Sequence, residues 1–208
     1  MYLAHYGFEQ EPFNITPDSH FLFPSQRHRE AMAAMVYGIE HRKGFIALTG
    51  EIGSGKTTIC RALLKQLKEN IKVALILNPQ LSDHELLQAI NVEFGLPHAS
   101  SSKRELLAVL NEFLLDEYAD GRNCVLIIDE SQRLSPDTLE QIRLISNLEL
   151  EHTKLIQIAL VGQPELDDIL RLPQLEQLNQ RITVRCHIGP LNLDEMTEYI
   201  NHRLGVAN

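Results

Sequence analysis

The chain has 208 residues, of which 44% are hydrophobic and 23% are charged. This is the composition of a folded globular protein and excludes a mostly disordered one. Its 19 Lys and Arg residues against 28 Asp and Glu residues give a formal charge of −9, which disfavours a protein that coats nucleic acid with its whole surface but allows a local basic patch. The chain has no apolar run of the roughly 20 residues that span a bilayer and no signal-peptide pattern at its start, so we expect a cytoplasmic location.

The first 26 residues are rich in aromatic and proline side chains and show no clear periodicity. Aromatic rings need cover from water, so we expect residues 1–26 to form an irregular N-terminal segment packed onto the core. Ser25 is a residue type that caps helix N-termini, and a helix is predicted over residues 27–42.

Five apolar runs alternate with helical patterns along the rest of the chain. The runs occupy residues 44–49, 72–77, 124–128, 155–161 and 182–188, and the helical patterns occupy residues 56–69, 83–94, 102–119, 136–149 and 193 onward. Runs that do not alternate with polar residues are typical of strands covered on both faces. Such strands, separated by helices, indicate an α/β domain with a parallel sheet. We expect this core over residues 27–190 and a further unit beginning at residue 191.

Residues 50–57 match the spacing G-x-x-x-x-G-K-[ST] of a phosphate-binding loop at every fixed position. The glycines let backbone N–H groups converge on an anion, and the next helix directs its N-terminal dipole at the same point. Lys56 supplies charge for the β- and γ-phosphates, and the Thr57 hydroxyl can bind Mg²⁺. ATP or ADP with Mg²⁺ is therefore the predicted ligand. The residues expected to bind it are Gly50, Glu51, Ile52, Gly53, Ser54, Gly55, Lys56, Thr57 and Thr58.

An acidic pair, Asp129 and Glu130, follows the apolar run at residues 124–128. At the end of a buried strand, Asp129 would hold Mg²⁺ through water, beside Thr57. Glu130 is placed to polarise the water that attacks the γ-phosphorus. The simpler alternatives are a helix N-cap for Asp129 and a surface salt bridge for Glu130.

Two further polar residues are candidates for catalysis. Gln163 ends the fourth run and can reach the γ-phosphate or the attacking water if that strand lies between the two phosphate-site strands; the alternative is a turn residue before a proline. Phosphoryl transfer develops charge that a guanidinium can neutralise, and Arg181, just before the fifth run, is the preferred candidate for a finger that acts in a neighbouring subunit's site. Arg185 and Arg171 are its rivals, and a solvated arginine is the alternative for each.

These residues together resemble the AAA+ ATPases of the ExeA/GspA family of type II secretion, with its MshM-like pilus relatives. The resemblance covers nearly the whole chain. The phosphate-binding loop is common to all P-loop NTPases, whereas the blocks at residues 144–149 and 157–166 are much more specific. The matching blocks lie at residues 1–23, 28–31, 50–57, 129–135, 144–149, 157–166 and 180–184.

The resemblance implies a three-layer P-loop NTPase fold whose five parallel strands, numbered along the chain, lie in the order 5-1-4-3-2. It implies oligomers with ATP at the subunit interfaces, Arg181 as the arginine finger, and residues 191–208 as the start of a helical lid. It also implies a membrane-protein partner in an envelope-spanning machine, and an inner-membrane anchor in the full-length protein. The N-terminal segment would lie near the adenine, with Phe13 and Ile15 in contact with it; plain packing is the alternative for both.

Two other function classes stay open. A DNA-transposition regulator resembling the TniB/TnsC ATPases would have a similar core and form ATP-dependent oligomers on DNA. The charge of −9 and the N-terminal aromatic block favour the secretion branch over this nucleic-acid partner. A scaffold that binds ATP without hydrolysing it has no need of a carboxylate at Glu130, so that residue argues against it.

Overall fold

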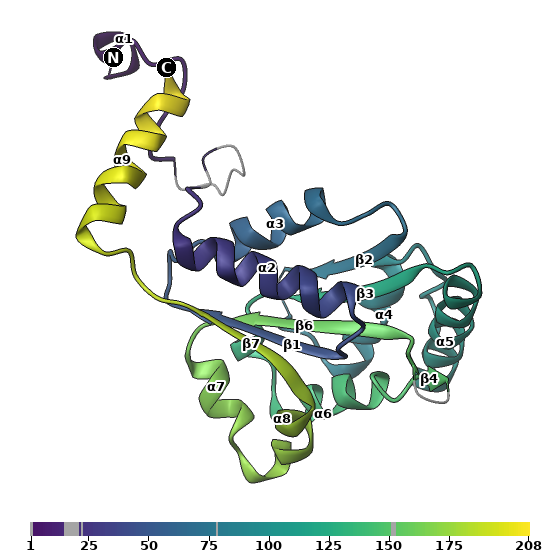
Figure 1. Ribbon diagram of the computed structural model, residues 1–208. Coiled ribbons are helices and arrows are strands. Elements are labelled where there is room, and N and C mark those ends of the chain that lie inside the picture. The colour runs from purple at the N-terminus through teal and green to yellow at the C-terminus, as the bar shows by residue number, and fades with distance from the viewer. Residues whose placement is uncertain (1, 15–20, 22, 78, 151–152) are drawn as a thin grey trace.

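The computed structural model of the protein describes residues 2–14, 21, 23–77, 79–150 and 153–208. The described elements follow one another in the order helix, helix, and then mostly strand and helix in alternation (Figure 1). They are α1 (Tyr2–Tyr6), α2 (Gln26–Glu40), β1 (Phe45–Gly50), α3 (Lys56–Gln66), β2 (Ile71–Ile76), α4 (Asp83–Glu93), α5 (Lys103–Ala119), β3 (Asn123–Ile128), η2 (Ser131–Arg133), α6 (Pro136–Ile145), β4 (Glu149–Leu150), β5 (Thr153–Lys154), β6 (Ile156–Gly162), α7 (Glu165–Leu170), η3 (Pro173–Leu175), α8 (Glu176–Arg181), β7 (Ile182–Ile188) and α9 (Leu193–Ala207).

Five of these strands form one parallel sheet in the order β2-β3-β6-β1-β7. Numbered along the chain, this is the predicted order 5-1-4-3-2. The three inner strands β1, β3 and β6 are buried at every position, as their unbroken apolar runs predict, and the edge strands β2 and β7 alternate in exposure. Thr49 pairs with Gly162, and Ile128 pairs with Leu160. The register therefore brings the carboxyl ends of β1, β6 and β3 to one edge of the sheet.

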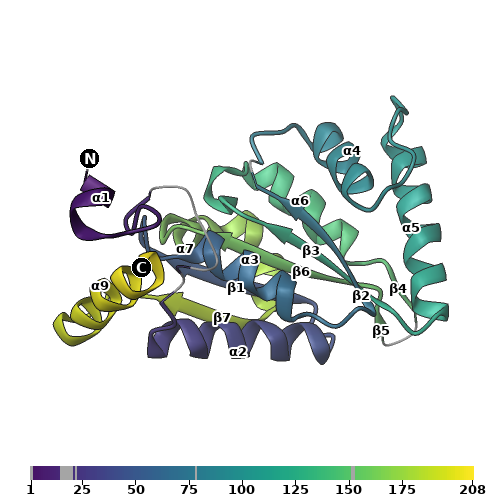
Figure 2. The same cartoon turned by 90° about the horizontal axis from the view of Figure 1, so that it is seen from above.

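Helices cover both faces of the sheet and make a three-layer fold (Figures 1 and 2). Helices α2 and α3 bury one core, with residues such as Met35 and Ile59, against one face. Helices α4, α5, α6, α7 and α8 bury a larger core against the other face, which includes Leu110 and Ile142. Each core holds apolar side chains from alternate positions of the same strands, which explains why those strands are apolar throughout.

The predicted helices form close to the predicted positions, and Ser25 caps α2, with its hydroxyl accepting a hydrogen bond from the His28 backbone. The apolar periodicity of the sequence does not predict α7 or the short β4–β5 hairpin. Both are brief, and a six-residue helix or a two-residue strand is too short to show a periodicity. None of the helices within the described ranges is both long and apolar enough to cross a bilayer.

The N-terminal segment, which is expected to be irregular, contains one short helix among its described residues. Its first described residues form the short helix α1, which Figures 1 and 2 show beside the C-terminal end of α9 and apart from the sheet. The Glu9 backbone N–H donates to the Ala207 carbonyl at 2.8 Å, and the Arg203 guanidinium lies 4.8 Å from the centre of the Phe21 ring. These contacts join the segment to α9.

Candidate nucleotide-binding and catalytic site

The phosphate-binding loop connects the end of β1 to the start of α3 at the carboxyl edge of the sheet. Gly53 and Gly55 have φ values of 78° and 85°, the left-handed region that glycine adopts without strain. Gly55 is the N-cap of α3 and has no side chain to accept from the helix's first N–H groups. The buried Ser54 hydroxyl has no hydrogen-bond partner within the described part of the chain. The loop therefore presents unpaired donors, as an anion site requires.

Lys56 is buried at the first position of α3, with 7% of its surface exposed. Its ammonium donates to the carbonyls of Gly50 at 2.7 Å and Glu51 at 2.8 Å. Burial lowers the pKa of Lys56, and the nearby carboxylates of Asp129 and Glu130 oppose that effect. A desolvated ammonium held by neutral carbonyls gains strongly from a phosphate placed beside it.

The two residues predicted to hold a metal ion are in direct contact. The Thr57 hydroxyl of α3 donates to the Asp129 carboxylate at 2.6 Å, and Asp129, just after β3, is 2% exposed. Hydroxyl and carboxylate oxygens are the ligands that Mg²⁺ prefers, and Mg²⁺ usually takes its other ligands from water and substrate phosphates. The chemistry of these oxygens and the unpaired Ser54 hydroxyl fit the predicted Mg²⁺–nucleotide. Asp129 also accepts from the Glu130 N–H at 2.9 Å.

Glu130 stands next to this pair in a conformation that is uncommon for a residue with a side chain, with φ of 55°. Its carboxylate accepts from the Gln132 amide at 2.7 Å and lies 3.5 Å from the Arg133 guanidinium. The salt bridge that is the simpler alternative for Glu130 is therefore present. It does not exclude catalysis, because the carboxylate is half-exposed beside Lys56 and Asp129.

Gln163 follows β6, which lies between β1 and β3 in the sheet. This placement is the one that its predicted role requires. Its backbone N–H donates to the side-chain oxygen of Gln132 at 3.0 Å. Gln132 thus lies between Gln163 and Glu130. The sequence predicts no role for Gln132, because a single polar residue after an acidic pair has no diagnostic spacing.

His28 of α2 is a second residue for which the sequence predicts no role in the site. It is buried, and its ring joins the Ser25 hydroxyl at 2.6 Å to the backbone carbonyl of Ser54 in the phosphate-binding loop at 2.9 Å. A carbonyl only accepts, so Nε2 carries the proton and donates to it. A Cβ added at Gly55 would approach the same ring nitrogen to 2.9 Å. Helix α2 therefore supports the loop from behind.

A family model of an AAA domain matches residues 39–170, which include the loop, the acidic pair and Gln163. The chain belongs to the AAA domain family. It is 45% identical over all 208 residues to General secretion pathway protein A of Aeromonas hydrophila, of which it spans 38%.

Solved structures show the same fold at low sequence identity. The ORC2 protein of Aeropyrum pernix, in ADPNP-ADP complexes, matches 96% of this chain and 56% of its own with a TM-score of 0.70 and 16% identity. Cdc6p of Pyrobaculum aerophilum matches 91% of this chain and 54% of its own, with a TM-score of 0.71 and 18% identity. Family and fold together make this chain an AAA-type P-loop ATPase domain with a nucleotide site.

Arg181 lies near the amino ends of the sheet strands, whereas the phosphate-binding loop follows the carboxyl end of β1. It ends α8 just before Ile182, which pairs with the first residue of β1, Phe45. Its guanidinium donates to the Ser146 hydroxyl at 3.1 Å and the Asn147 side chain at 2.6 Å, after α6. The fold therefore does not bring Arg181 into the site of its own subunit.

The two rival arginines also have partners within the same subunit. Arg185 on β7 donates to the Asn179 carbonyl at 3.1 Å and lies 3.6 Å from Asp167. Arg171 pairs with Asp168 at 3.1 Å on the surface.

The structure describes one of the two residues that are proposed to contact the adenine, Phe13, and not the other, Ile15. Phe13 is 49% exposed, and the Arg203 guanidinium of α9 lies 5.8 Å from the centre of its ring. Ile15 lies outside the described residues. Within the loop, Glu51 and Ile52 are exposed, and Thr58 is half-buried on α3.

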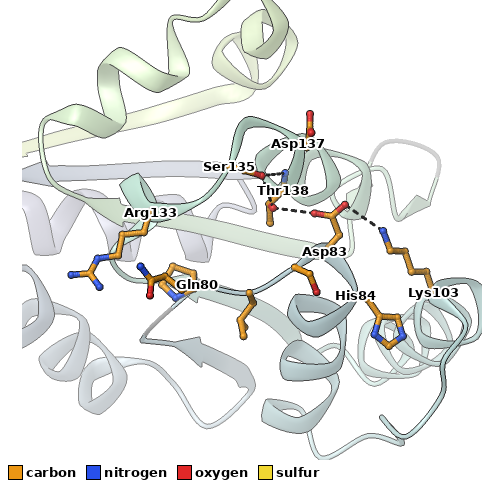
Figure 3. Close-up of a pocket in the computed structure, with 11 residues that line it drawn as sticks. Gln80, Asp83, His84, Lys103, Arg133, Ser135, Asp137 and Thr138 are labelled. Carbon is orange, nitrogen blue, oxygen red and sulfur yellow. Dashed lines mark hydrogen bonds and ion pairs between the residues drawn. The ribbon is translucent and has the colours of Figure 1, made fainter.

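A pocket of about 460 Å³ lies between the starts of α4 and α6 (Figure 3). On one side of it Asp83 pairs with Lys103 at 3.3 Å and accepts from the Thr138 hydroxyl at 3.0 Å. Arg133, which also contacts Glu130, lines the other side. Figure 3 shows Asp83, Lys103 and Thr138 apart from Arg133.

Proposed function

We propose that this AAA domain hydrolyses Mg-ATP and that the protein uses the cycle to drive or switch assembly of a type II secretion or related pilus machine in the bacterial envelope. The 2.6 Å contact between Thr57 and Asp129, beside Lys56 and Glu130, carries the chemical part of this proposal. The 45% identity to General secretion pathway protein A across all 208 residues supports the biological part.

Each side chain has a role in the proposed hydrolysis. The loop N–H groups and Lys56 would bind the β- and γ-phosphates, and Thr57 and Asp129 would hold Mg²⁺, which would neutralise charge on the phosphoryl group. Glu130 accepts a proton from the attacking water, and Gln163 hydrogen-bonds the γ-phosphate or that water.

The wider assignments complete the proposal. We expect homo-oligomers with ATP at subunit interfaces, where Arg181 reaches the neighbour's nucleotide. We expect α9 to begin a helical lid, and Phe13 and Ile15 to lie near the adenine. A membrane protein of the secretion machinery is the proposed partner, and the protein would act from the cytoplasmic side, with an inner-membrane anchor in its full-length form.

Replacement of the general base tests the chemistry. We expect Glu130→Gln to lower kcat about 100-fold or more, because an amide cannot take the proton from water. Binding of Mg-ATP should stay within about threefold of the wild type, because neutralising Glu130 removes no phosphate ligand. Steady-state phosphate release and nucleotide titration measure the two effects. Glu112→Gln, at an exposed position of α5, is the matched control; retained turnover in Glu130→Gln would contradict the assignment.

The secretion assignment is tested with the same assay. Turnover per subunit should rise with protein concentration and should not respond to duplex DNA. Strong stimulation by DNA would favour a transposition-type regulator instead. Bound ATP without any turnover would indicate a nucleotide-binding scaffold.

A further inference from the structure

The Gln132 side chain bridges two strand ends at the carboxyl edge of the sheet. Its amide nitrogen donates to the Glu130 carboxylate at 2.7 Å, and its amide oxygen accepts from the Gln163 backbone N–H at 3.0 Å. A carboxylate only accepts and an N–H only donates, so the chemistry of the partners fixes the orientation of the amide. Glutamine is one of the two side chains that offer a donor and an acceptor in this planar arrangement, and asparagine is shorter.

The surrounding backbone makes room for this side chain. A Cβ added at Gly162 would lie 2.7 Å from the Gln132 oxygen and 3.3 Å from its backbone nitrogen. Glycine at this position is therefore explained by space for the bridge, since Gly162 does not have a positive φ. Glycine on β6 and glutamine after β3 are two separate features of the sequence that serve one contact.

The Glu130 backbone is in the left-handed region, which is unfavourable for a residue with a side chain. The backbone is tied to Asp129 through the Glu130 N–H. That bond leaves the carboxylate free to rotate about its own side-chain torsions, and Gln132 and Arg133 are the groups that hold it.

We propose that Gln132 is a positioning residue that aims the Glu130 carboxylate and ties its position to the end of β6 at Gln163. The inference rests on the proposed function of Glu130 as the general base.

Two substitutions separate the two ends of the bridge. Gln132→Glu keeps an oxygen for the Gln163 N–H but places a like charge where the donor to Glu130 was. Gln132→Met keeps the length of the side chain and removes both hydrogen bonds. Gln66→Met, at an exposed position at the end of α3, is the matched control.

Kinetics give the first readout. Both Gln132 variants should lower kcat about tenfold or more while the KM for ATP stays within about threefold, because the phosphate ligands are intact. A side chain that only supports the fold would instead lower the melting temperature and ATP affinity together. Wild-type kcat in Gln132→Glu would overturn the proposal.

Amide hydrogen exchange gives a second readout that does not need turnover. The Gln163 N–H should exchange about tenfold faster in Gln132→Met but keep its protection in Gln132→Glu and Gln66→Met. The Gln132 side-chain amide protons should lose protection in Glu130→Ala. Unchanged exchange in Gln132→Met, or unchanged Gln132 protons in Glu130→Ala, would overturn the bridge. If the wild-type chain hydrolyses no ATP but the variants show these exchange changes, the proposed function is refuted and the bridge is established.

Discussion

At the residue scale, the site depends on buried polar groups that the protein itself leaves incompletely paired. Lys56 is desolvated against the carbonyls of Gly50 and Glu51, and the Ser54 hydroxyl has no partner in the described part of the molecule. Such groups cost stability without a ligand, because burial removes the hydrogen bonds that water would supply. A bound phosphate would satisfy both groups at once.

The support of the loop by His28 gives a prediction at this scale. His28→Ala removes the hydrogen bond to the Ser54 carbonyl and the cover behind Gly55. We expect ATP affinity to fall about tenfold and the free energy of unfolding to fall by about 1–2 kcal/mol, the usual contribution of one or two buried hydrogen bonds. Isothermal titration and urea unfolding measure these effects.

The control for this prediction is His98→Ala, at an exposed histidine that the site does not use. His28→Gln should recover part of the affinity, since a glutamine amide can donate to the same carbonyl. If His28→Ala binds ATP as the wild type does, the ring only fills space between α2 and the loop.

At the element scale, the described residues of the N-terminal segment pack against α9. The Arg203 guanidinium lies within 4.8–5.8 Å of the ring centres of Phe21, Tyr199 and Phe13, and it donates to the Pro12 carbonyl. Arginine is suited to this position because its flat guanidinium stacks on rings and still donates hydrogen bonds. A movement of α9 would therefore carry the segment with it.

Replacing Arg203 with alanine tests whether this side chain holds the N-terminal segment against α9. Arg203→Ala should release the segment, because each ring contact contributes about 0.5–2 kcal/mol and the hydrogen bond to Pro12 is lost as well. We expect proteolysis within residues 2–14 to become at least several times faster, while unfolding of the sheet domain changes little. Limited proteolysis with mass spectrometry measures the first effect and urea unfolding the second. Arg104→Ala, at an exposed position on α5, is the control; equal proteolysis in both variants would show that the segment is held by other contacts.

At the scale of the whole molecule, the position of Arg181 near the amino ends of the sheet strands bears on how subunits would cooperate. Within one subunit it contacts Ser146 and Asn147 and does not reach the nucleotide site. If it completes the site of a neighbour, as we propose, the guanidinium must leave or extend from these partners when subunits meet. Hydrolysis then requires two subunits.

Mixing two inactive variants tests this cooperation. Arg181→Ala keeps Glu130 but lacks the finger, and Glu130→Gln keeps the finger but lacks the base. We expect each alone to lose about 100-fold or more in kcat, and their mixture to recover a substantial fraction, because an Arg181 from one subunit can serve an intact site on the other. Phosphate release from mixtures at constant total protein measures this. A mixture no more active than the sum of its parts would contradict a role in the neighbouring site, and Asn147→Ala controls for the lost intramolecular contact.

Local and periodic features of the sequence were enough to predict much of this molecule. The phosphate-binding loop is a continuous stretch whose chemistry follows from its spacing, and the five apolar runs mark strands because buried strands need apolar side chains on both faces. The sheet order followed from family resemblance and is confirmed by the structure. It places β6, which Gln163 follows, between the two phosphate-site strands β1 and β3.

Only the tertiary structure showed which distant groups meet at the site. The contacts of Gln132 with Gln163, of His28 with Ser54 and of Arg203 with Pro12 join residues 31, 26 and 191 positions apart. No periodicity or spacing records such pairs, because each depends on how separate elements pack and on where one side chain finds room. The sequence alone determined which chemical groups gather at the candidate site, and packing decided how those groups are held.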